Sequence, residues 1–400
     1  MKRFIVVVLD SFGIGAMDDV CEVRPQDIHA NTAKHLLEYN KNIRWPRLLK
    51  LGLINALGEE VGEYKKSESA IFGKSKLAHF GGDTYFGHQE IMGTKPMEPL
   101  LNCFKEVIDV IQVDLNENGY RTRRFEKEGL ALICVNEALF IGDNLETDQG
   151  QAINVTASFD LVSFEEIIKV GRIVRKHVQV SRVIVFGGVE VTFEDLVNSI
   201  TVRGEYIGLD APKSKVYRKG YQVLHIGYGV DTAMQVPAAL HEKGILTYLY
   251  GKVADIVENP YGIMKPGVDT EGLFELLLED LKKKESGFYC LNVQETDLAG
   301  HQCEPDIYID RLNVSDEAIQ KIIDEMNKED ILVIMADHGN DPTADSTKHS
   351  REYVPILIYK EGLSEINIGI RETMADVGAT VAEYFGTEIP FGTSFLKEMA

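Results

Sequence analysis

An uninterrupted apolar run near the start of the chain, residues 4–9 (FIVVVL), constrains the fold more than any other feature. A strand that is apolar at every position, without alternation, is typical of a parallel sheet covered by helices on both faces. Asp10 follows the run directly. Because open α/β sheets bind their ligands at the carboxyl ends of their strands, we expect Asp10 to lie at a ligand-binding edge.

The second half of the chain repeats this order of helix, apolar strand and polar loop. The expected strands are residues 244–250, 288–293, 331–336 and 354–359, and the expected helices are residues 232–243, 271–284, 315–327 and 372–385. Such alternation predicts a doubly wound α/β sheet.

Residues 100–225 follow a different pattern. The expected elements are helices at 104–116 and 165–177 and strands at 131–135 and 182–186, separated by loops rich in glycine and lysine. Almost none of the polar motifs described below occur here. We therefore predict a core of residues 1–99 and 226–400, and a smaller α+β cap domain of residues 100–225 inserted into it.

The charge balance limits the partners of the chain. It carries 63 Asp and Glu against 42 Lys and Arg, a formal net charge of −21. A surface this acidic repels phosphate backbones and anionic lipids, so we expect it to bind neither nucleic acid nor membrane. No apolar run approaches the roughly 20 residues of a membrane-spanning helix. Five scattered cysteines without a CxxC pair indicate a reduced, cytoplasmic protein.

Carboxylate and imidazole side chains follow several of the expected strands. The candidates are Asp10, the pair Asp297 and His301 four residues apart, the adjacent pair Asp337 and His338, and His349. Each alone has a structural explanation, since an aspartate after a strand often caps a helix or a turn. Several carboxylates gathered at one edge are costly without cations between them. Mixed Asp and His ligands suit Mn²⁺, Zn²⁺ or Mg²⁺, so we expect two divalent ions.

A glycine-rich segment, residues 81–90 (GGDTYFGHQE), has two interpretations. The structural one is a turn before a helix that is capped by Asp83 or Thr84. The functional one is a hydroxyl nucleophile, Thr84, at a helix start, where backbone N–H groups and a metal ion stabilise phosphoryl charge. Nucleotide-binding glycine loops are excluded, because Gly13 and Gly15 lack the third glycine of the dinucleotide fingerprint and no GxxxxGK[ST] loop exists.

Five segments together resemble the phosphopentomutase family of the alkaline phosphatase superfamily. They are residues 8–15 (VLDSFGIG), residues 82–90 with GDT, GH and E, residues 336–343 (ADHGNDPT), residues 349–355 with H and REYVP, and the stretch 371–396. They follow the family order and cover both ends of the chain. The resemblance implies an alkaline-phosphatase-like core beneath an inserted cap. It also implies an isomerase of nucleotide metabolism that moves phosphate between C1 and C5 of ribose or deoxyribose phosphate.

The resemblance also implies roles for the residues of the core. Asp10, Asp337 and His338 would hold one ion, bridged by Thr84 or its phosphate, and Asp297, His301 and His349 would hold the second. Thr84 would be the residue that becomes phosphorylated. The implied ions are Mn²⁺, although Zn²⁺ and Mg²⁺ fit the same ligands.

Four further residues are candidates for contact with the substrate. By resemblance, Arg182, Arg218 and the core residue Lys252 would contact its phosphate, and Asp148 the sugar hydroxyls. Arginine grips phosphate in a bidentate manner, whereas lysine acts as a point charge. The alternative for each of the four is an ordinary solvated surface charge.

The chain departs from the family where a substrate would be recognised. Gln89 stands where the family carries tryptophan, Gln302-Cys303-Glu304 replaces a basic pair, and Lys219-Gly220 and residues 146–151 differ from their counterparts. All metal and nucleophile positions are kept. The phosphoryl chemistry is therefore more firmly indicated than the pentose.

Two other functions fit the same residues. The first is a phosphatase, a phosphodiesterase or a mutase acting on another phosphorylated substrate at this site. A mutase must exclude water from its phosphothreonine, so release of inorganic phosphate would distinguish a hydrolase. The second is a sensor of sugar phosphates without catalysis, which would show no turnover.

Overall fold

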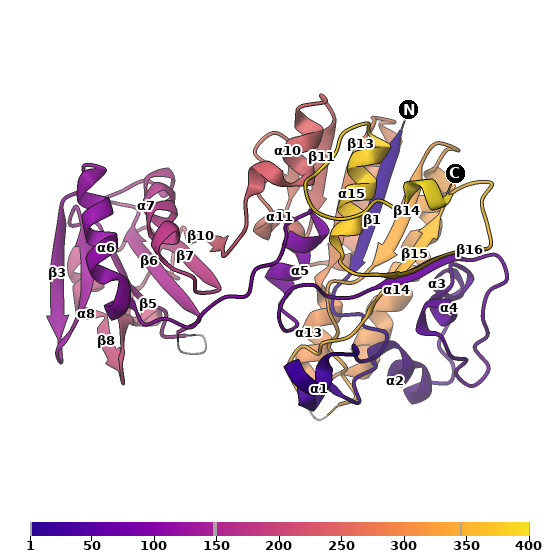
Figure 1. The fold of residues 1–400 in the computed structure, drawn as a ribbon, viewed down its shortest axis with the longest axis horizontal. Coiled ribbons are helices and arrows are strands. Elements are labelled where there is room, and N and C mark those ends of the chain that lie inside the picture. The colour runs from indigo at the N-terminus through magenta and orange to yellow at the C-terminus, as the bar shows by residue number, and fades with distance from the viewer. Residues whose placement is uncertain (1, 147–149, 345, 400) are drawn as a thin grey trace. The chain divides into compact units, whose positions relative to one another are not determined.

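The chain folds as two compact units, each with its own sheet and hydrophobic core (Figure 1). The computed structural model describes residues 2–146, 150–344 and 346–399. One unit comprises Met1–Pro96 and Asp231–Ala400, and the other comprises Met97–Val230. The chain thus leaves the first unit after Pro96 and returns to it at Asp231.

The first unit is built on a mixed sheet of eight strands within the described residues. They are β1 (Arg3–Leu9), β2 (Ile71–Ser75), β11 (Leu246–Tyr250), β12 (Ile263–Lys265), β13 (Gly287–Val293), β14 (Ile331–Met335), β15 (Val354–Tyr359) and β16 (Ile366–Arg371). Their spatial order is β12-β11-β13-β1-β14-β15-β2-β16. From β12 to β14 the neighbours are parallel, and β15 is antiparallel to both of its neighbours.

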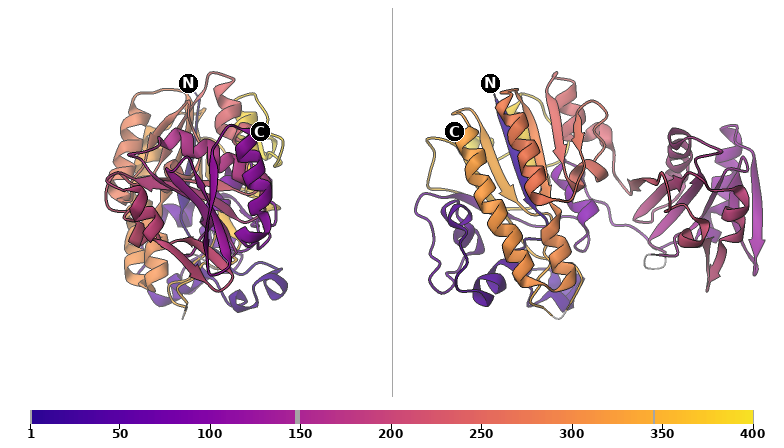
Figure 2. Two further views of the ribbon diagram at one scale, coloured as in Figure 1. Left: turned by 90° about the vertical axis from the view of Figure 1, so that its left-hand side faces the viewer. Right: turned by 180° about the vertical axis from the view of Figure 1, so that it is seen from behind.

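Helices cover both faces of this sheet, which confirms the predicted doubly wound α/β core. One face carries α10 (Val236–His241), α11 (Lys252–Ile256) and α15 (Ala375–Tyr384), and the view from behind in Figure 2 shows α12 (Thr270–Lys282) and α14 (Pro305–Glu325) over the other. The remaining helices of this unit are α1 (Val20–Val23), η1 (Pro25–Asp27), α2 (Thr32–Tyr39), α3 (Pro46–Lys50), α4 (Leu53–Leu57), α5 (Thr84–Ile91), η2 (Thr232–Met234), α13 (Gln294–Gln302) and η3 (Leu396–Met399). None of the described helices is long and apolar enough to cross a lipid bilayer.

The central strand β1 explains why the apolar run at 4–9 was informative. Each of these six side chains is 0% exposed, because β13 and β14 flank the strand and helices cover both of its faces. The expected strands at 288–293, 331–336 and 354–359 coincide closely with β13, β14 and β15.

Two expected helices differ from the structure. The segment 232–243 is interrupted at Gln235, which is extended, because Pro237 has no N–H to donate to a preceding helical turn. The segment 315–327 is the second half of a much longer helix, α14, which begins at Pro305. Proline is favoured at the first position of a helix, so Pro305 marks where α14 begins. The periodicity of residues 315–327 did not indicate this start.

The unit Met97–Val230 contains a second mixed sheet and a small hairpin. Its described elements are α6 (Phe104–Glu117), β3 (Thr122–Lys127), β4 (Leu130–Val135), β5 (Leu139–Asp143), β6 (Ala152–Ser158), α7 (Phe164–His177), β7 (Arg182–Gly188), α8 (Phe193–Asn198), β8 (Ile200–Arg203), β9 (Tyr206–Leu209), α9 (Ala211–Ser214) and β10 (Gln222–Gly227). The larger sheet has the order β10-β7-β6-β5-β4-β3, and its apolar face packs against α6 and α7. The two expected strands lie within β4 and β7.

Candidate active site

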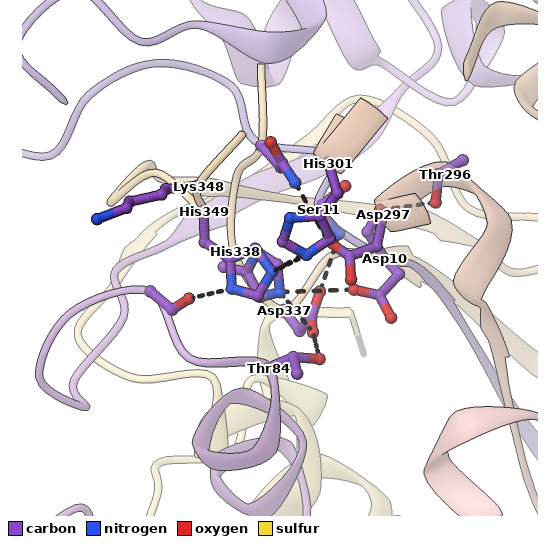
Figure 3. Close-up of polar contacts among 12 residues, drawn as sticks. Asp10, Ser11, Thr84, Thr296, Asp297, His301, Asp337, His338, Lys348 and His349 are labelled. Atoms are coloured by element: carbon purple, nitrogen blue, oxygen red, sulfur yellow. Dashed lines mark hydrogen bonds and ion pairs between the residues drawn. The ribbon is translucent and has the colours of Figure 1, made fainter. Parts of the chain in front are cut away.

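The carboxyl ends of three neighbouring strands bring together side chains that are far apart in the sequence. In the sheet β1 lies between β13 and β14, and all three are parallel. Asp10 follows β1, Asp337 follows β14, and Asp297 lies in the first turn of α13, directly after β13. Figure 3 shows the three carboxylates gathered at this edge. The order of the parallel strands therefore determines where the polar groups meet.

Asp297 forms a cluster with two histidines (Figure 3). Its Oδ1 lies 3.1 Å from His349 Nε2 and 3.5 Å from His301 Nε2, and the two Nε2 atoms are 2.9 Å apart. His301 Nδ1 donates a hydrogen bond to Thr347 O at 2.6 Å. His349 Nδ1 donates to Gly82 O at 2.7 Å. Because each ring donates from Nδ1, both Nε2 lone pairs face the carboxylate oxygen, and this donor set fits a divalent cation.

Asp10, Asp337 and His338 form a second cluster beside the first. His338 Nε2 lies 3.5 Å from Asp10 Oδ1 and 3.3 Å from Asp337 Oδ2, and all three side chains are fully buried. Asp10 Oδ1 and His338 Nε2 have no hydrogen-bond partner among the residues that the structure describes. Unpartnered buried polar atoms are costly, and a cation bound by both would satisfy them. These residues therefore fit a second divalent ion.

Burial shifts the pKa values of this second cluster. Burial, together with the negative charge of Asp337, raises the pKa of Asp10 to about 7, although Lys252 opposes the shift. Burial also lowers the pKa of His338 to about 4, because the imidazolium loses its hydration. His338 is therefore neutral near pH 7, the form in which imidazole binds a metal ion.

Thr84 is the first residue of α5, and its hydroxyl lies against the second cluster. Asp83 caps the helix by accepting a hydrogen bond from Phe86 N at 3.1 Å. The hydroxyl of Thr84 donates to Asp337 Oδ2 at 2.7 Å (Figure 3). The first N–H groups of a helix lack intrahelical acceptors and favour negative charge. Asp83 is therefore the helix cap, and the Thr84 hydroxyl lies at the start of the helix beside the second cluster.

Lys252 also lies within the site. Its Nζ is 2.9 Å from Asp10 Oδ2 and 3.2 Å from Asp297 Oδ2. The side chain comes from the first residue of α11, and only 14% of it is exposed. The structure therefore brings Lys252 to the same edge as Thr84 and the six candidate metal ligands.

The other candidate substrate residues belong to the unit Met97–Val230. Arg182 is half-buried at the start of β7. Arg218 is exposed in the segment between α9 and β10. Asp148 lies outside the described residues.

Three residues that were not predicted from the sequence hold Asp10 and Asp337 in place. Asn292 Nδ2 donates to Asp10 Oδ2 at 3.0 Å, and the hydroxyl of Thr296 donates to Asp10 O at 2.6 Å. Ser11 N donates to Asp337 Oδ1 at 3.0 Å from a left-handed backbone conformation, φ 67°. Only Asn292 had a signal in the sequence, as an amide inside the apolar strand 288–293.

Arg351 determines the position of the loop that precedes α5. Its guanidinium donates to three backbone carbonyls, those of Leu77 (2.9 Å), His79 (2.7 Å) and Gly81 (2.8 Å). It also forms an ion pair with Asp19 at 2.8 Å. The side chain is 6% exposed. Arg351 of the REYVP segment therefore fixes the backbone of the loop that leads to Thr84.

Comparison with known proteins identifies the family. A family model described as the metalloenzyme superfamily matches residues 2–389. The chain belongs to this superfamily, as the resemblance of its motifs indicated. It is 31% identical to a phosphopentomutase of Desulfitobacterium hafniense over 422 residues, which cover 100% of both chains. A phosphopentomutase of Limosilactobacillus reuteri is 30% identical over 419 residues, covering 100% of this chain and 99% of that protein.

These findings confirm the predicted class of enzyme, a phosphomutase and hence an isomerase. Among solved structures, a phosphoglycerate mutase of Leishmania mexicana is similar with a TM-score of 0.49 and 14% identity, covering 98% of this chain and 97% of that one.

Proposed function

We propose that this protein is a cytoplasmic enzyme that interconverts the 1- and 5-phosphates of ribose or deoxyribose, with Thr84 as the carrier of the phosphoryl group. The observation that carries the proposal is the 2.7 Å hydrogen bond from the Thr84 hydroxyl to Asp337 Oδ2, at the edge where the six candidate ligands meet. The two relatives named phosphopentomutase support a pentose as the sugar.

We assign two Mn²⁺ ions to this edge of the sheet. One ion would be held by the second cluster, Asp10, Asp337 and His338. The other ion would be held by the first cluster, Asp297, His301 and His349. When bound, the ions would supply positive charge that lowers the pKa of a nearby hydroxyl and neutralises a phosphoryl group during transfer. The unpartnered Asp10 Oδ1 and His338 Nε2 support this assignment.

The chain's own groups prepare Thr84 for transfer. Asp337 Oδ2 accepts a hydrogen bond from the Thr84 hydroxyl, and this contact fixes the orientation of the lone pairs on Thr84 Oγ1. The positive end of the α5 helix dipole would stabilise the negative charge of a phosphate on Thr84 Oγ1, because Thr84 is the first residue of the helix. Hydrogen bonds to the backbone hold Asp337 and the three imidazoles, and the amide of Asn292 holds Asp10, so little reorganisation is required when the reaction begins.

The proposed reaction consists of two phosphoryl transfers. Phosphorylated Thr84 gives its phosphoryl group to the free hydroxyl of a pentose monophosphate, the Oγ1–P bond breaks, and a pentose bisphosphate forms with release of the hydroxyl proton. Thr84 Oγ1 then attacks the other phosphorus, the sugar O–P bond breaks, and the sugar oxygen regains a proton. Thr84 ends the cycle phosphorylated, so no phosphate is consumed.

We propose that the unit Met97–Val230 acts as the cap that binds the sugar phosphate and excludes water. Arg182 and Arg218 would contact its phosphate, and Asp148, which is outside the described residues, its hydroxyls. Lys252 would be the core cation for the phosphate, since its ammonium already lies against Asp10 and Asp297. Arginine suits a bidentate grip of phosphate, and a lone lysine suits a point contact.

The test replaces the proposed carrier and follows both possible products. The Mn²⁺-loaded protein is incubated with ribose 5-phosphate, and formation of ribose 1-phosphate and release of inorganic phosphate are measured together. We expect isomer formation without stoichiometric phosphate release, and loss of turnover in Thr84→Ala with unchanged metal content. Thr84→Ser, which keeps a hydroxyl, should retain part of the activity. Isomerisation by Thr84→Ala would contradict the carrier role, and stoichiometric phosphate release would show a hydrolase.

A further inference from the structure

One face of α5 approaches Asp337 closely. Thr84, Gly87 and His88 occupy positions i, i+3 and i+4 of the helix and share this face. A Cβ atom on Gly87 would lie 2.9 Å from Asp337 O and 3.0 Å from Asp337 Cβ, so no larger residue fits there without displacement. The glycine therefore lets the helix bring His88 and Thr84 to the same carboxylate.

The imidazole of His88 is fully buried and makes contacts from both ring nitrogens. Its Nδ1 lies 2.9 Å from Thr84 O and 3.2 Å from Asp337 Oδ2. Its Nε2 lies 2.9 Å from Asn292 Nδ2. One ring thus contacts the backbone of the proposed carrier, the carboxylate that accepts its hydroxyl, and the amide of a neighbouring strand.

The contacts of Asn292 define which nitrogen of His88 carries the hydrogen. Asn292 Nδ2 also lies 3.0 Å from Asp10 Oδ2, and a carboxylate oxygen requires a donor at that distance. The amide nitrogen therefore faces both Asp10 and His88, so His88 Nε2 is the acceptor. His88 Nδ1 is then the N–H that is shared between Thr84 O and Asp337 Oδ2.

We propose that His88 is a positioning residue for phosphoryl transfer: its Nδ1–H fixes the Asp337 carboxylate relative to Thr84, and so aims the Thr84 hydroxyl. This inference rests on the proposed role of Thr84 as the carrier. The chain of contacts Asp10, Asn292, His88, Asp337 and Thr84 joins the ends of β1, β13 and β14 to the start of α5. His88 is thus the link between the helix that carries the nucleophile and the sheet that carries the ligands.

A role for His88 as a metal ligand is the alternative. Its ring nitrogens lie close to carboxylate oxygens of Asp10 and Asp337, in a group that could hold an ion. Both nitrogens are nevertheless engaged, Nδ1 by Thr84 O and Nε2 by Asn292. A ligand would need a free lone pair, and the Nε2 lone pair already accepts a hydrogen bond. Metal content therefore distinguishes the two roles.

Two substitutions separate the two nitrogens of His88. In His88→Asn the side-chain amide nitrogen can occupy the place of Nδ1, whereas in His88→Gln it can occupy only the place of Nε2. Both are measured as full-length, Mn²⁺-loaded proteins, with ribose 5-phosphate and with p-nitrophenyl phosphate as a general phosphoryl donor. We expect His88→Gln to lower kcat by about 10- to 100-fold, the range seen when residues that orient metal ligands are changed, with KM and metal content unchanged. We expect His88→Asn to restore kcat at least about tenfold above His88→Gln, since it restores the donor.

Several results would overturn the proposal. Equal kcat values for the two variants would show that the Nδ1–H does not matter. Loss of bound Mn²⁺ in proportion to the loss of kcat would show a metal ligand. Wild-type protein that hydrolyses p-nitrophenyl phosphate without forming ribose 1-phosphate would contradict only the proposed function, and His88 would then be judged on the p-nitrophenyl phosphate rates. Wild-type protein inactive with both compounds would overturn both proposals.

Discussion

Lys252 Nζ lies 2.9 Å from Asp10 Oδ2, and the same ammonium lies 3.2 Å from Asp297 Oδ2. The lysine thus bridges carboxylates of both clusters. Burial by itself would lower the pKa of Lys252, but the negative charges of Asp10 and Asp297 raise it above its usual value. Lys252 therefore remains charged and offsets part of the repulsion among the buried carboxylates.

Replacing Lys252 by methionine should destabilise the metal-free protein far more than the Mn²⁺-loaded protein. Breaking a buried ion pair leaves an uncompensated charge and costs roughly 3 kcal/mol. Bound cations would replace the lost positive charge, so the difference should shrink when Mn²⁺ is present. Urea unfolding of both proteins, with Mn²⁺ and with a chelator, measures the two free energies of unfolding.

Lys265→Met is the matched control for this prediction. Lys265 Nζ lies 2.6 Å from Asp280 Oδ2, a buried carboxylate that belongs to neither cluster. Its loss should lower the free energy of unfolding by the same amount with and without Mn²⁺. If Lys252→Met behaved in the same metal-independent way, the charge-compensating role of Lys252 would be wrong.

Glu352 should be required as a carboxylate, although no cation pairs with it in the described structure. It is fully buried and accepts hydrogen bonds from Gly15 N, Thr32 N, the Thr32 hydroxyl and the Ser350 hydroxyl. Glutamine would turn one acceptor oxygen into an amino group that faces these donors. We expect Glu352→Gln to cost about 2 kcal/mol of stability, as for buried groups left unsatisfied. Mn²⁺ affinity should also fall, because the loops around Gly15 and Ser350 carry the ligands.

Thermal unfolding and calorimetric titration with Mn²⁺ check this expectation. The control is Glu372→Gln, whose side chain is 78% exposed and forms an ion pair with Lys76, so its loss should change stability by less than about 0.5 kcal/mol. Mn²⁺ affinity equal to that of the wild type in Glu352→Gln would show that the loops do not depend on this carboxylate.

The strands that position the site could be predicted because each is a run of apolar residues in the sequence. Residues 4–9 are apolar throughout, and such runs form strands that are buried on both faces. Strands β2 and β16 could not be predicted in the same way. They contain glycine, lysine or alternating polar residues. They form strands because β2 pairs with β15 and β16 pairs with β2.

Asp10, Asp297 and Asp337 could be named because each comes shortly after a recognisable strand. Their supporting residues could not be. His88 and Glu352 belong to motifs that carry the family resemblance, but the sequence assigned them no role, because their partners are known only from the packing of the fold. Two of the residues that donate to Glu352, Gly15 and Thr32, are more than 300 residues away, a separation that no local pattern encodes. Hydrogen bonds of this kind are a product of the fold.

Gly300→Ala should weaken the metal cluster although alanine is the better helix former. Alanine stabilises a helix interior by roughly 1 kcal/mol relative to glycine. Here, however, the new Cβ would lie 2.6 Å from Asn340 Cγ and 2.7 Å from Asn340 Nδ2. That amide donates to Asp297 Oδ1 at 3.3 Å, so the displacement reaches a candidate ligand. We expect lower Mn²⁺ affinity and no gain in stability, measured by titration and thermal unfolding.

A double-mutant cycle tests the cause. Asn340→Ser removes the two atoms that the new methyl group would strike most closely and leaves only the Cβ at 3.1 Å, so in that background Gly300→Ala should cost less. Equal effects of Gly300→Ala in both backgrounds would mean that contact with Asn340 is not the reason.

The unit Met97–Val230 should carry its own pH dependence through Asp143. This carboxylate is 1% exposed and accepts hydrogen bonds from Phe104 N and Ile207 N, each at 2.8 Å. Burial raises the pKa of Asp143 to about 6, because it removes water from the charged form. Between the unfolded and the folded pKa, the folded state binds more protons than the unfolded state. Stability from this group is therefore present at low pH and is lost as the pH rises from about 4 to 6.

Urea unfolding between pH 4.5 and 7 should show this loss as roughly 2 kcal/mol in the wild type. Asp143→Asn should be less stable than the wild type, because the amide oxygen can accept from only one of the two backbone N–H groups. Since asparagine does not titrate, the free energy of unfolding of this variant should lack this component of the pH dependence. Asp160→Asn provides the comparison, since Asp160 is exposed in the same unit and accepts a hydrogen bond from Val191 N at 3.0 Å. It should keep the slope of the wild type. An unchanged slope in Asp143→Asn would mean that Asp143 is ionised in the folded unit throughout this range, and that its two backbone donors outweigh its burial.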